Sequence, residues 1–577
     1  MDGHQTPMPN SPQKVQPGIR IAQIILALCC ACLGYFYMLN YVWFSSASMA
    51  PIFVFLIRKF DVDAAKLGVL VCLIALVWKR PAPILRLIDR LGAHPRLAAA
   101  ACVLLVCVGA PLIYHDHPFS MDEYAALFQA RVFALGQTSA HLPLPLLDWL
   151  LVPEFNGQFL VASHSSGQVI EGYWPGFALL LAPFALIGAP WLCNALLAGV
   201  GLWLIHRLTL EISGERRAAG WAVLFAAGSG VFLANAISFY SMQAHLTLNL
   251  LFAWLLFRPT GYRALAAGFV GSIALILHNP FPHALFALPW ILALALDGKR
   301  RRLLLPLLLG YLPLLAVAVG WLLLRADIAA SASHGAVLSS IVSGVFRWPD
   351  EGLFNMRVAS TIKLWVWAVP GLLVFACLGA RRSWDDRRVR LLAFSALLTF
   401  CGYLFVKLDQ GHGWGYRYFH SAWGVLPVLA GCAMTRLKGE QDRVVCFAGT
   451  AAVLSLLLIV PVQLFQINEV ITGQQSQLGG QVRPGNNVYF LDRFTGFYLS
   501  DMIQTDPQLR ERDLLLVSHG RERDAAFIRA NWPEAVQEKA GSGVEHWYLG
   551  PQEQRQGPNA LSSALHFELK PPQDPAP

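Results

Sequence analysis

The feature that most constrains this chain is a series of apolar runs of about 15–25 residues, which short clusters of arginine and lysine separate. Of the 577 residues, 56% are hydrophobic and only 14% are charged, so a soluble fold would leave far too much apolar surface in water. As helices, runs of this length match the thickness of the hydrocarbon core of a bilayer. The sequence therefore predicts an all-α polytopic membrane protein.

We expect about 13 membrane-spanning helices. They are predicted near residues 20–42, 66–79, 97–114, 190–208, 217–234, 244–258, 263–278, 283–297, 303–324, 361–379, 389–406, 421–436 and 444–466. A further apolar stretch, 177–188, lies between Pro175 and Pro190 and is typical of a re-entrant or interfacial segment.

The basic residues predict the orientation of the chain in the membrane. They collect in inter-helix segments that the predicted crossings place on one side, whereas the long loop 115–173 carries Arg131 as its single basic residue. Because cytoplasmic loops carry the excess of arginine and lysine, the N-terminal tail 1–19 is expected in the cytoplasm. Loop 115–173, loop 407–420 and the C-terminal region are expected outside. The net charge of +9 is spread over short loops, which does not indicate nucleic-acid binding.

The sequence divides into regions of different composition. We expect a transmembrane part at 20–466 and a small external α/β appendage at 467–549. Within the appendage, strands are predicted near 488–491, 514–517 and 546–549, and a helix at 521–538. The tail 550–577 is rich in proline and glutamine, a composition typical of disorder.

The adjacent carboxylates Asp122 and Glu123 are the leading candidates for catalysis, because they lie at the head of the long external loop. On a helix they point about 100° apart, so one can act as a general base while the other supports it or binds a metal ion. The alternative is structural: Ser120 or Asp122 caps a helix and Glu123 stabilises its first turn.

A second candidate is the glycine- and aromatic-rich segment 411–420. Its glycines let the backbone approach a ligand closely, and Arg417 can hold a phosphate with two hydrogen bonds. We expect His412, Trp414, Tyr416 and Tyr418 to contact the substrate beside it. The alternative is a belt of aromatic residues at the membrane interface with one snorkelling arginine.

Further substrate-binding candidates are scattered along the chain: Arg131, Glu171, Tyr173, Trp174 and His245. A cap or packing role is the structural alternative for His245. The histidines of the long loop have no spacing that specifies a metal site, so none is assigned, although the adjacent carboxylates permit a divalent cation.

Taken in order, these motifs resemble the GT-C superfamily of membrane glycosyltransferases, and within it the bacterial protein-mannosyltransferase-like branch, glycosyltransferase family 39. The resemblance covers residues 97–540 and rests on Asp122 to Arg131, Tyr173 to Gly176, Gly214 to Arg216, Ser238 to His245, Gly415 to Tyr418 and Asp506-Pro507. It implies a transmembrane catalytic module at 97–466, which leaves 20–96 as an accessory N-terminal transmembrane unit.

This resemblance implies an enzyme of the bacterial inner membrane that moves a sugar from a polyprenyl-phosphate donor to a lipid, glycan or protein acceptor on the periplasmic side. It implies inversion at the sugar and a first-loop carboxylate, Asp122 or Glu123, as general base. The chain departs from lipid A aminoarabinose transferases in two places: Trp174-Pro175-Gly176 replaces their Lys-Pro-Pro-Leu turn, and Gln243-Ala244-His245 lacks their later aspartate. The Trp-Trp-Asp signature of oligosaccharyltransferases is also absent, so the acceptor is not implied.

Residues 20–113 also resemble the first three helices of a major facilitator transporter, through Asp61 to Gly68 and Asp89 to Gly92. A membrane transporter or flippase for a lipid-linked or small solute is therefore the alternative function. A non-catalytic envelope scaffold whose C-terminal region binds a partner is the third.

Overall fold

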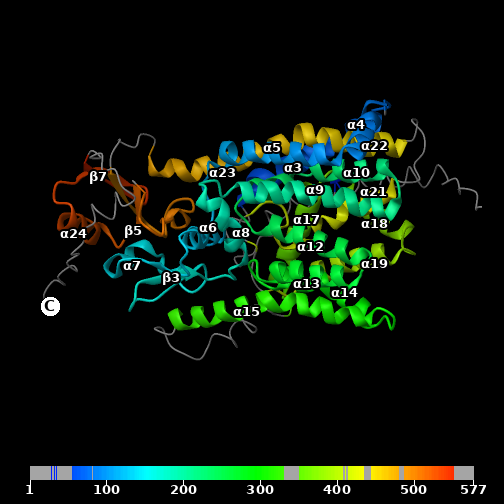
Figure 1. Cartoon of the computed structure of the whole chain (residues 1–577). Helices are drawn as coiled ribbons and strands as arrows, with labels where there is room; N and C mark the ends of the chain where they lie inside the picture. Colours follow the sequence, from blue (N-terminus) through cyan, green and yellow to red (C-terminus); the bar gives the residue numbers. More distant parts are fainter. Residues whose placement is uncertain are drawn as a thin grey trace, which may run out of the picture.

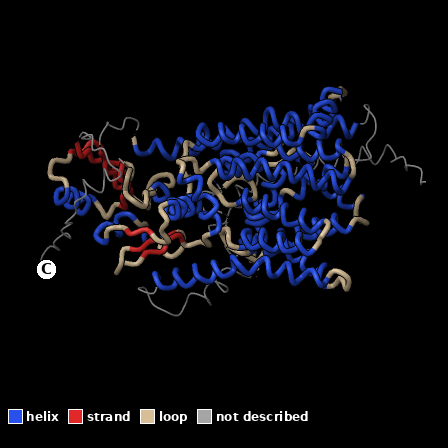
Figure 2. Tube along the Cα trace, in the orientation of Figure 1, coloured by secondary structure: helices blue, strands red, loops and turns tan. Residues whose placement is uncertain are grey.

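The structure, a computed structural model, describes residues 55–80, 82–329, 350–406, 413–434, 443–479, 486–511 and 513–550, together with residues 28, 31, 32, 34, 348 and 410. Helices run side by side along the long axis of the molecule, and the strands are confined to one end (Figures 1 and 2). The name "sheet end" is used below for that end, formed by residues 115–175 and 486–550. The predicted tail and first span lie almost entirely outside the described residues, as does the C-terminal tail 551–577.

Most helices belong to the bundle. They are α3 (Val62–Val77), α4 (Ala82–Ala93), α5 (Pro95–Gly109), α8 (Gly176–Leu186), α9 (Leu192–Ser213), α10 (Arg216–Ala227), α11 (Gly230–Ile237), α12 (Met242–Phe257), α13 (Gly261–Leu275), α14 (Phe281–Ala295), α15 (Leu304–Ala329), α17 (Glu351–Val366), α18 (Leu372–Arg382), α19 (Arg387–Tyr403), α20 (His420–Trp423), α21 (Val425–Ala433), α22 (Arg443–Leu454) and α23 (Val460–Gln475). Short π-helical or 3₁₀ turns adjoin them: η1 (Ile57–Asp61), η2 (Ala110–Tyr114), η4 (Arg301–Leu303), η5 (Arg417–Phe419), η6 (Ser455–Ile459) and η7 (Ser476–Leu478).

Helices long and apolar enough to cross a membrane are fewer than the predicted spans. Within the described residues there are 4 by length and composition, or up to 5 if α10 and α11, which are bent by 62°, form one span. The 4 are Pro95–Tyr114, Leu192–Ser213, Arg301–Ala329 and Arg443–Leu478. Other predicted spans coincide with shorter apolar helices such as α12, α13 and α14. The count of about 13 crossings therefore stays a prediction.

Two predicted spans are not continuous helices, and the first of them, 217–234, is divided between α10 and α11. The segment 361–379 is divided between α17 and α18, because the chain breaks between Val366 and Leu372. Pro370 cannot donate a backbone hydrogen bond, and Gly371 adopts a left-handed φ of 90°. The predicted re-entrant segment 177–188 is a helix, α8, with Pro183 inside it.

Small residues let neighbouring helices approach closely. A Cβ atom on Gly268 of α13 would lie 1.9 Å from the carbonyl oxygen of Leu307, and one on Gly310 of α15 would lie 2.3 Å from that of Leu265. Only glycine fits at both positions, which is the packing typical of helices in a bilayer. The outward face of α15 carries exposed leucines such as Leu305 and Leu323.

The sheet end contains two sheets. Residues 115–173 form α6 (Met121–Ala134), α7 (Leu144–Leu150), η3 (Pro153–Phe155) and an antiparallel sheet of order β1-β3-β2 from β1 (Ala140–His141), β2 (Leu160–Ala162) and β3 (Gln168–Glu171). The C-terminal residues form a mixed sheet of order β5-β4-β7-β6, in which β4 pairs parallel to β5 and antiparallel to β7. Its elements are β4 (Asn486–Leu491), η8 (Ser500–Met502), β5 (Asp513–Val517), α24 (Arg521–Asn531), β6 (Val536–Gly541) and β7 (Val544–Gly550).

The three strands predicted in the C-terminal region are confirmed as parts of β4, β5 and β7. The helix predicted at 521–538 is wrong in its second half, because α24 ends at Asn531 and β6 begins at Val536. Pro533 explains the difference, because its ring clashes with the preceding residue when that residue adopts helical φ and ψ angles.

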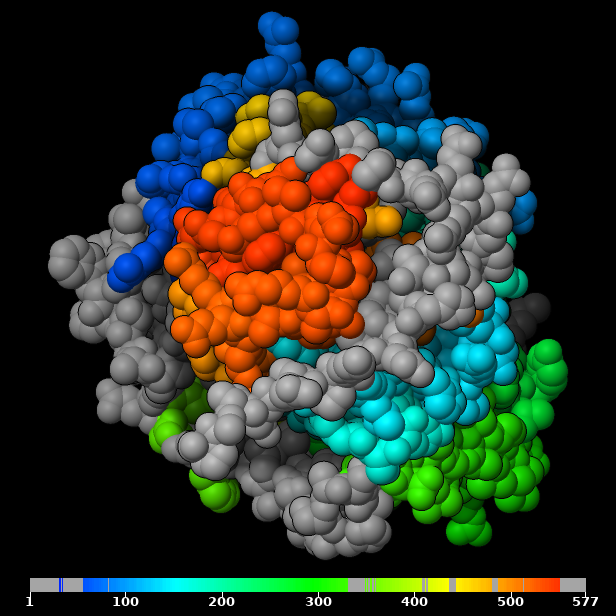
Figure 3. Space-filling model, turned by 90° about the vertical axis from the view of Figure 1, so that its left-hand side faces the viewer, coloured from blue at the N-terminus to red at the C-terminus, as the bar shows by residue number. Residues whose placement is uncertain are grey.

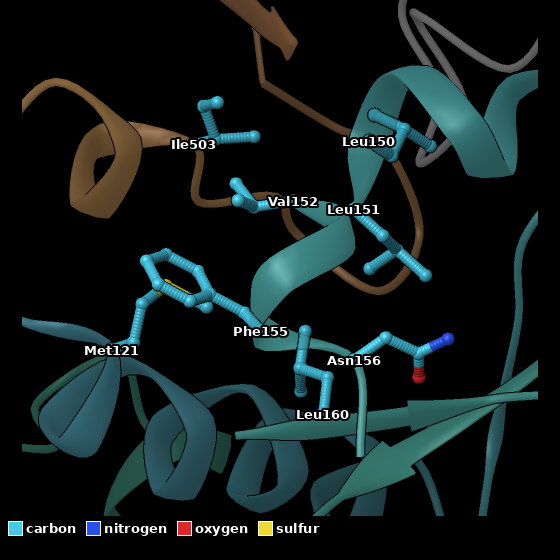
Figure 4. Close-up of a pocket in the computed structure, with 8 residues that line it drawn as sticks. All are labelled: Met121, Leu150, Leu151, Val152, Phe155, Asn156, Leu160 and Ile503. Atoms are coloured by element: carbon cyan, nitrogen blue, oxygen red, sulfur yellow. The ribbon is translucent and has the colours of Figure 1, made fainter. Parts of the chain in front are cut away.

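The two parts of the sheet end pack against each other, and Figure 3 looks onto this end of the molecule. Met121, Val152, Phe155 and Ile503 come from three separate segments and line one small apolar pocket between them (Figure 4). The backbone N–H of Met121 donates to Asp501 Oδ1 at 2.9 Å. The start of α6 is thereby fixed between the bundle and the C-terminal sheet.

Candidate functional site

Asp122 lies in the first turn of α6 and meets Arg417 from the other half of the chain. Arg417 Nη1 donates to Asp122 Oδ2 at 2.6 Å, and the two side chains are 7% and 12% exposed. The hydroxyl of Tyr173 donates to the second carboxylate oxygen, Oδ1. Both oxygens of Asp122 thus accept hydrogen bonds, and Asp122, Tyr173 and Arg417 come from three segments that are far apart in the sequence. A charge-assisted hydrogen bond of this kind is strong when it is buried.

Arg417 is held from several directions. Its Nη2 donates to the carbonyl oxygen of Gln410 at 2.6 Å, and its backbone N–H donates to Gln410 Oε1 at 3.1 Å. The guanidinium lies over the ring of Tyr240, 4.7 Å from the ring centroid. Its Nε is buried and has no hydrogen-bond partner among the described residues. The side chain is therefore fixed in place while one donor stays unused.

Two glycines shape the segment that carries Arg417. Gly413 and Gly415 have φ values of 113° and 69°, which side chains other than glycine rarely adopt. A Cβ atom on Gly415 would lie 2.5 Å from Val231 Cγ2. The segment therefore packs closely against α11.

Glu123 has a different environment from its neighbour. It is fully buried and accepts the backbone N–H groups of Phe119 at 3.0 Å and Phe239 at 2.9 Å. It is also hydrogen-bonded to the hydroxyl of Tyr114, which accepts Trp414 Nε1–H at 2.6 Å. Burial raises the pKa of Glu123 to about 8, although the two backbone donors oppose the rise. Glu123 joins the start of α6 to the residues between α11 and α12.

Ser120 occupies the N-cap position of α6, as the structural alternative expected, but its side chain makes no capping hydrogen bond. Its hydroxyl instead lies 3.0 Å from the hydroxyl of Tyr240. Asp122 and Glu123 do occupy the first turn of α6, where the helix dipole favours carboxylates. The structural and the chemical interpretations of the pair are thus compatible.

Tyr173 and Trp174 line the other side of the Asp122–Arg417 pair. The ring of Tyr173 lies 3.8 Å from that of His278, centroid to centroid, and its carbonyl oxygen accepts Trp321 Nε1–H at 2.7 Å. The backbone N–H of Trp174 donates to the carbonyl oxygen of His278 at 3.3 Å. Glu171 is also buried here, and burial raises its pKa well above the usual range.

Several predicted residues lie beside Arg417 in the same segment and have other aromatic rings as their neighbours. Trp414 is buried and stacks on Phe119, with ring centroids 6.1 Å apart. Tyr416 is buried against Phe419. Tyr418 stacks on Tyr403, with centroids 4.8 Å apart and an interplanar angle of 15°.

One predicted residue, Arg131, lies away from the pair. Arg131, in the last turn of α6, is 3.9 Å from Asp506 Oδ2 and 3.7 Å from Glu511 Oε1. It lines a separate cleft of about 430 Å³ between α6 and the C-terminal sheet, so it is not placed to contact the same ligand atom as Arg417. His245 is buried in α12, and neither ring nitrogen has a hydrogen-bond partner among the described residues. His412 lies outside the described residues.

Three residues of the site were not predicted: Tyr240, His278 and Gln410. Their positions in the predicted topology could have identified two of them, because Tyr240 and His278 lie at helix corners that are expected on the same side of the membrane as Asp122. Gln410 gave no signal, since its role depends on backbone contacts. In the part of the chain that the structure describes, no group of three or more His, Cys, Asp or Glu side chains is arranged to hold a metal ion.

Comparisons with known proteins identify the fold. No family model and no curated protein sequence matches the chain. Solved structures do match it: ArnT from Cupriavidus metallidurans in the apo state and the same protein bound to undecaprenyl phosphate, each with a TM-score of 0.51 at 13% sequence identity. The chain has the ArnT fold. The match covers 79% of this chain and 98% or 99% of ArnT, so it extends over nearly the whole of the solved protein.

The resemblance to GT-C proteins that the motifs predicted is confirmed at the level of the fold by the match to ArnT. The described residues form a membrane-protein fold of mostly apolar helices with a small C-terminal sheet, again as expected. The assignment to family 39 stays a prediction.

Proposed function

We propose that this protein is an integral membrane glycosyltransferase that moves a sugar from a polyprenyl-phosphate donor to an acceptor on the periplasmic side. The observation that carries the proposal is the buried pair of Arg417 and Asp122, 2.6 Å apart, with Tyr173 on the second carboxylate oxygen. The fold supports it, since ArnT has been solved with undecaprenyl phosphate bound. From the family resemblance we place the enzyme in the bacterial inner membrane, and from the distribution of basic residues we place its N-terminus in the cytoplasm.

Arg417 is suited to bind the donor phosphate. Its Nε has no partner among the described residues, and its Nη1 is bonded to Asp122. A phosphate oxygen beside the guanidinium can accept a hydrogen bond from Nε. A second phosphate oxygen can compete with Asp122 for the hydrogen bond from Nη1. Binding of the donor therefore weakens the hold of Arg417 on Asp122 and frees one carboxylate oxygen for the acceptor.

In the transfer step, Asp122 takes the proton of an acceptor hydroxyl or amine. The acceptor atom forms a bond to the anomeric carbon from the face opposite the phosphate, so the configuration inverts. The bond from that carbon to the phosphate oxygen breaks, and its electron pair leaves with the phosphate. Arg417 stabilises the charge of this leaving group, which needs no proton because it is already a stabilised anion. Tyr173 keeps Asp122 oriented throughout.

The experiment measures donor-lipid binding and transfer separately. Purified full-length protein in nanodiscs is titrated with undecaprenyl phosphate by native mass spectrometry, in the wild type and in Arg417→Gln. We expect the variant to bind at least about tenfold more weakly, because one charge-assisted bond is worth about 1.5–3 kcal/mol. Undiminished binding by Arg417→Gln would contradict the proposal.

A matched control is Arg388→Gln. Arg388 also pairs with an aspartate, Asp386, at 2.6 Å, but it lies near the start of α19 at the opposite end of the bundle (Figure 1). Its loss should leave the affinity for undecaprenyl phosphate unchanged. Transfer is then tested with undecaprenyl-phosphate-linked sugars, and movement of the lipid across proteoliposomes without covalent transfer would favour a flippase instead.

A further inference from the structure

The N-terminal unit contributes a buried ion pair to the bundle. Asp61, the last residue of η1, and Lys363 of α17 approach to 2.7 Å, Oδ2 to Nζ, and each side chain is 1% exposed. Two charges taken out of water lose several kcal/mol of hydration, so such a pair gives little net stability. A charged pair inside a membrane protein therefore points to a role other than stability.

The second oxygen of Asp61 binds a tryptophan. Trp367 Nε1 donates to Asp61 Oδ1 at 2.7 Å. Trp367 follows the last residue of α17, and its carbonyl oxygen accepts the backbone N–H of Val231 at 3.0 Å. Asp61 thus determines the direction of the indole ring at the break between α17 and α18.

The indole of Trp367 lies directly behind the segment that carries Arg417. A Cβ atom on Gly415 would lie 3.4 Å from Trp367 Cβ, and the Trp367 and Trp414 ring centroids are 6.2 Å apart. Trp414 in turn donates to Tyr114, which is bonded to Glu123. An unbroken series of contacts therefore runs from Asp61 to both halves of the candidate site.

Two further contacts hold the N-terminal unit in place. Lys59 Nζ lies 2.6 Å from Glu469 Oε1 in α23, and the ring of Phe55 lies 5.1 Å from that of Phe497, which belongs to the sheet end. The residues just before Asp61 are thus anchored as well.

From these contacts we propose that Asp61 is a positioning residue for the catalytic segment 413–417: it orients Trp367, and Trp367 holds that segment so that Arg417 meets Asp122. The inference rests on the proposed function for the role of Arg417. It assigns the N-terminal unit, which the sequence suggested as an accessory, to the support of the active site. Asp61 touches no substrate in this role.

The test separates the hydrogen bond from the charge. In Asp61→Asn/Lys363→Met both charges are gone, but the asparagine carbonyl still accepts from Trp367. In Asp61→Leu/Lys363→Met the acceptor is gone as well, and neither variant leaves an unpaired buried charge. Full-length proteins are labelled with 5-fluorotryptophan, and the ¹⁹F resonance of Trp414 is assigned by its loss in Trp414→Phe.

We expect the Asn/Met variant to keep the wild-type ¹⁹F shift of Trp414 and its affinity for undecaprenyl phosphate within about twofold. The Leu/Met variant should shift the Trp414 resonance and bind at least about fivefold more weakly, since a lost buried hydrogen bond costs about 1–3 kcal/mol. A Trp414 resonance and an affinity that are the same in both double variants would overturn the inference.

Two further variants keep the test decisive. Asp63→Asn is the matched control, because Asp63 pairs with Lys66 at 2.8 Å but is 57% exposed, and it should change neither readout. Should Leu/Met fail to fold, Trp367→Phe keeps the ion pair and removes the N–H donor together with part of the indole ring, and unchanged affinity there would also overturn the inference. The ¹⁹F shift does not depend on lipid binding, so a failure of the proposed function remains distinguishable from a failure of this inference.

Discussion

Arg417 and Asp122 are 295 positions apart in the sequence, yet Arg417 Nη1 and Asp122 Oδ2 lie 2.6 Å apart. Glu123, the next residue, makes no such contact and accepts backbone N–H groups instead. Two adjacent carboxylates therefore have separate roles, which follow from the different directions in which they leave the first turn of α6.

The first prediction distinguishes these roles. Asp122→Asn should lower the transfer rate on the order of 10²–10⁴-fold, because the amide cannot take a proton. It should also bind undecaprenyl phosphate more tightly, since Arg417 loses its competing partner. Glu123→Gln should have a much smaller effect on the rate. Transfer assays and lipid titrations of both variants check this, and a wild-type rate in Asp122→Asn would exclude Asp122 as the base.

The second prediction concerns the hydroxyl of Tyr173. Tyr173→Phe removes one of the two donors to Asp122 while keeping the ring beside His278. We expect a rate at least about tenfold lower, with a lower midpoint of thermal unfolding as well, because a hydrogen bond to a charged group contributes about 1.5–3 kcal/mol. Tyr124→Phe is the control: the Tyr124 hydroxyl donates to the carbonyl oxygen of Thr505 at 2.8 Å, away from Asp122. Equal rates in the two variants would argue against an orienting role for Tyr173.

The third prediction is a pH dependence of stability. Burial raises the pKa of Glu123 from 4.5 to about 8, so the folded state binds the proton more tightly than the unfolded chain does. The stability that Glu123 contributes is fully present below its pKa in the unfolded chain. It is lost as the pH rises through its pKa in the folded protein. Thermal unfolding between pH 5 and pH 8.5 should show a falling midpoint, and Glu123→Gln should flatten that slope. An equal slope in the variant would show that other groups, such as Asp501, cause the dependence.

The fourth prediction tests the close approach at Gly415. Gly415→Ala should destabilise the protein, since a left-handed backbone alone costs about 1–2 kcal/mol with a side chain and the new methyl group would meet Val231 at 2.5 Å. Weaker binding of undecaprenyl phosphate should accompany it, because Arg417 moves with the segment. Adding Val231→Ala should recover part of the loss. Gly473→Ala is the control, because no atom lies within 4 Å of the new Cβ.

Local patterns identified much of the fold. The segments that became α9, α12, α13 and α14 were recognisable from continuous apolar runs, because hydropathy over a helix length depends only on neighbouring residues. The same approach missed the break between α17 and α18, where apolar residues continue on both sides of Pro370 and Gly371.

The candidate site was less accessible to such reasoning. Arg131 and Arg417 were both expected to bind substrate, and the residues next to each in the sequence do not show which carboxylate it meets. The bundle places Arg417 on Asp122, whereas the C-terminal sheet places Asp506 and Glu511 beside Arg131.

The sequence by itself determined that this chain is a helical membrane protein, and it identified an acidic pair and a glycine-rich arginine segment. Only the tertiary structure decided that Asp122 faces Arg417, that Glu123 is enclosed by backbone donors, and that Asp61 reaches the same region through Trp367. The physical reason is that apolar length and helical period are properties of adjacent residues. Which charges meet is instead set by packing between segments hundreds of residues apart.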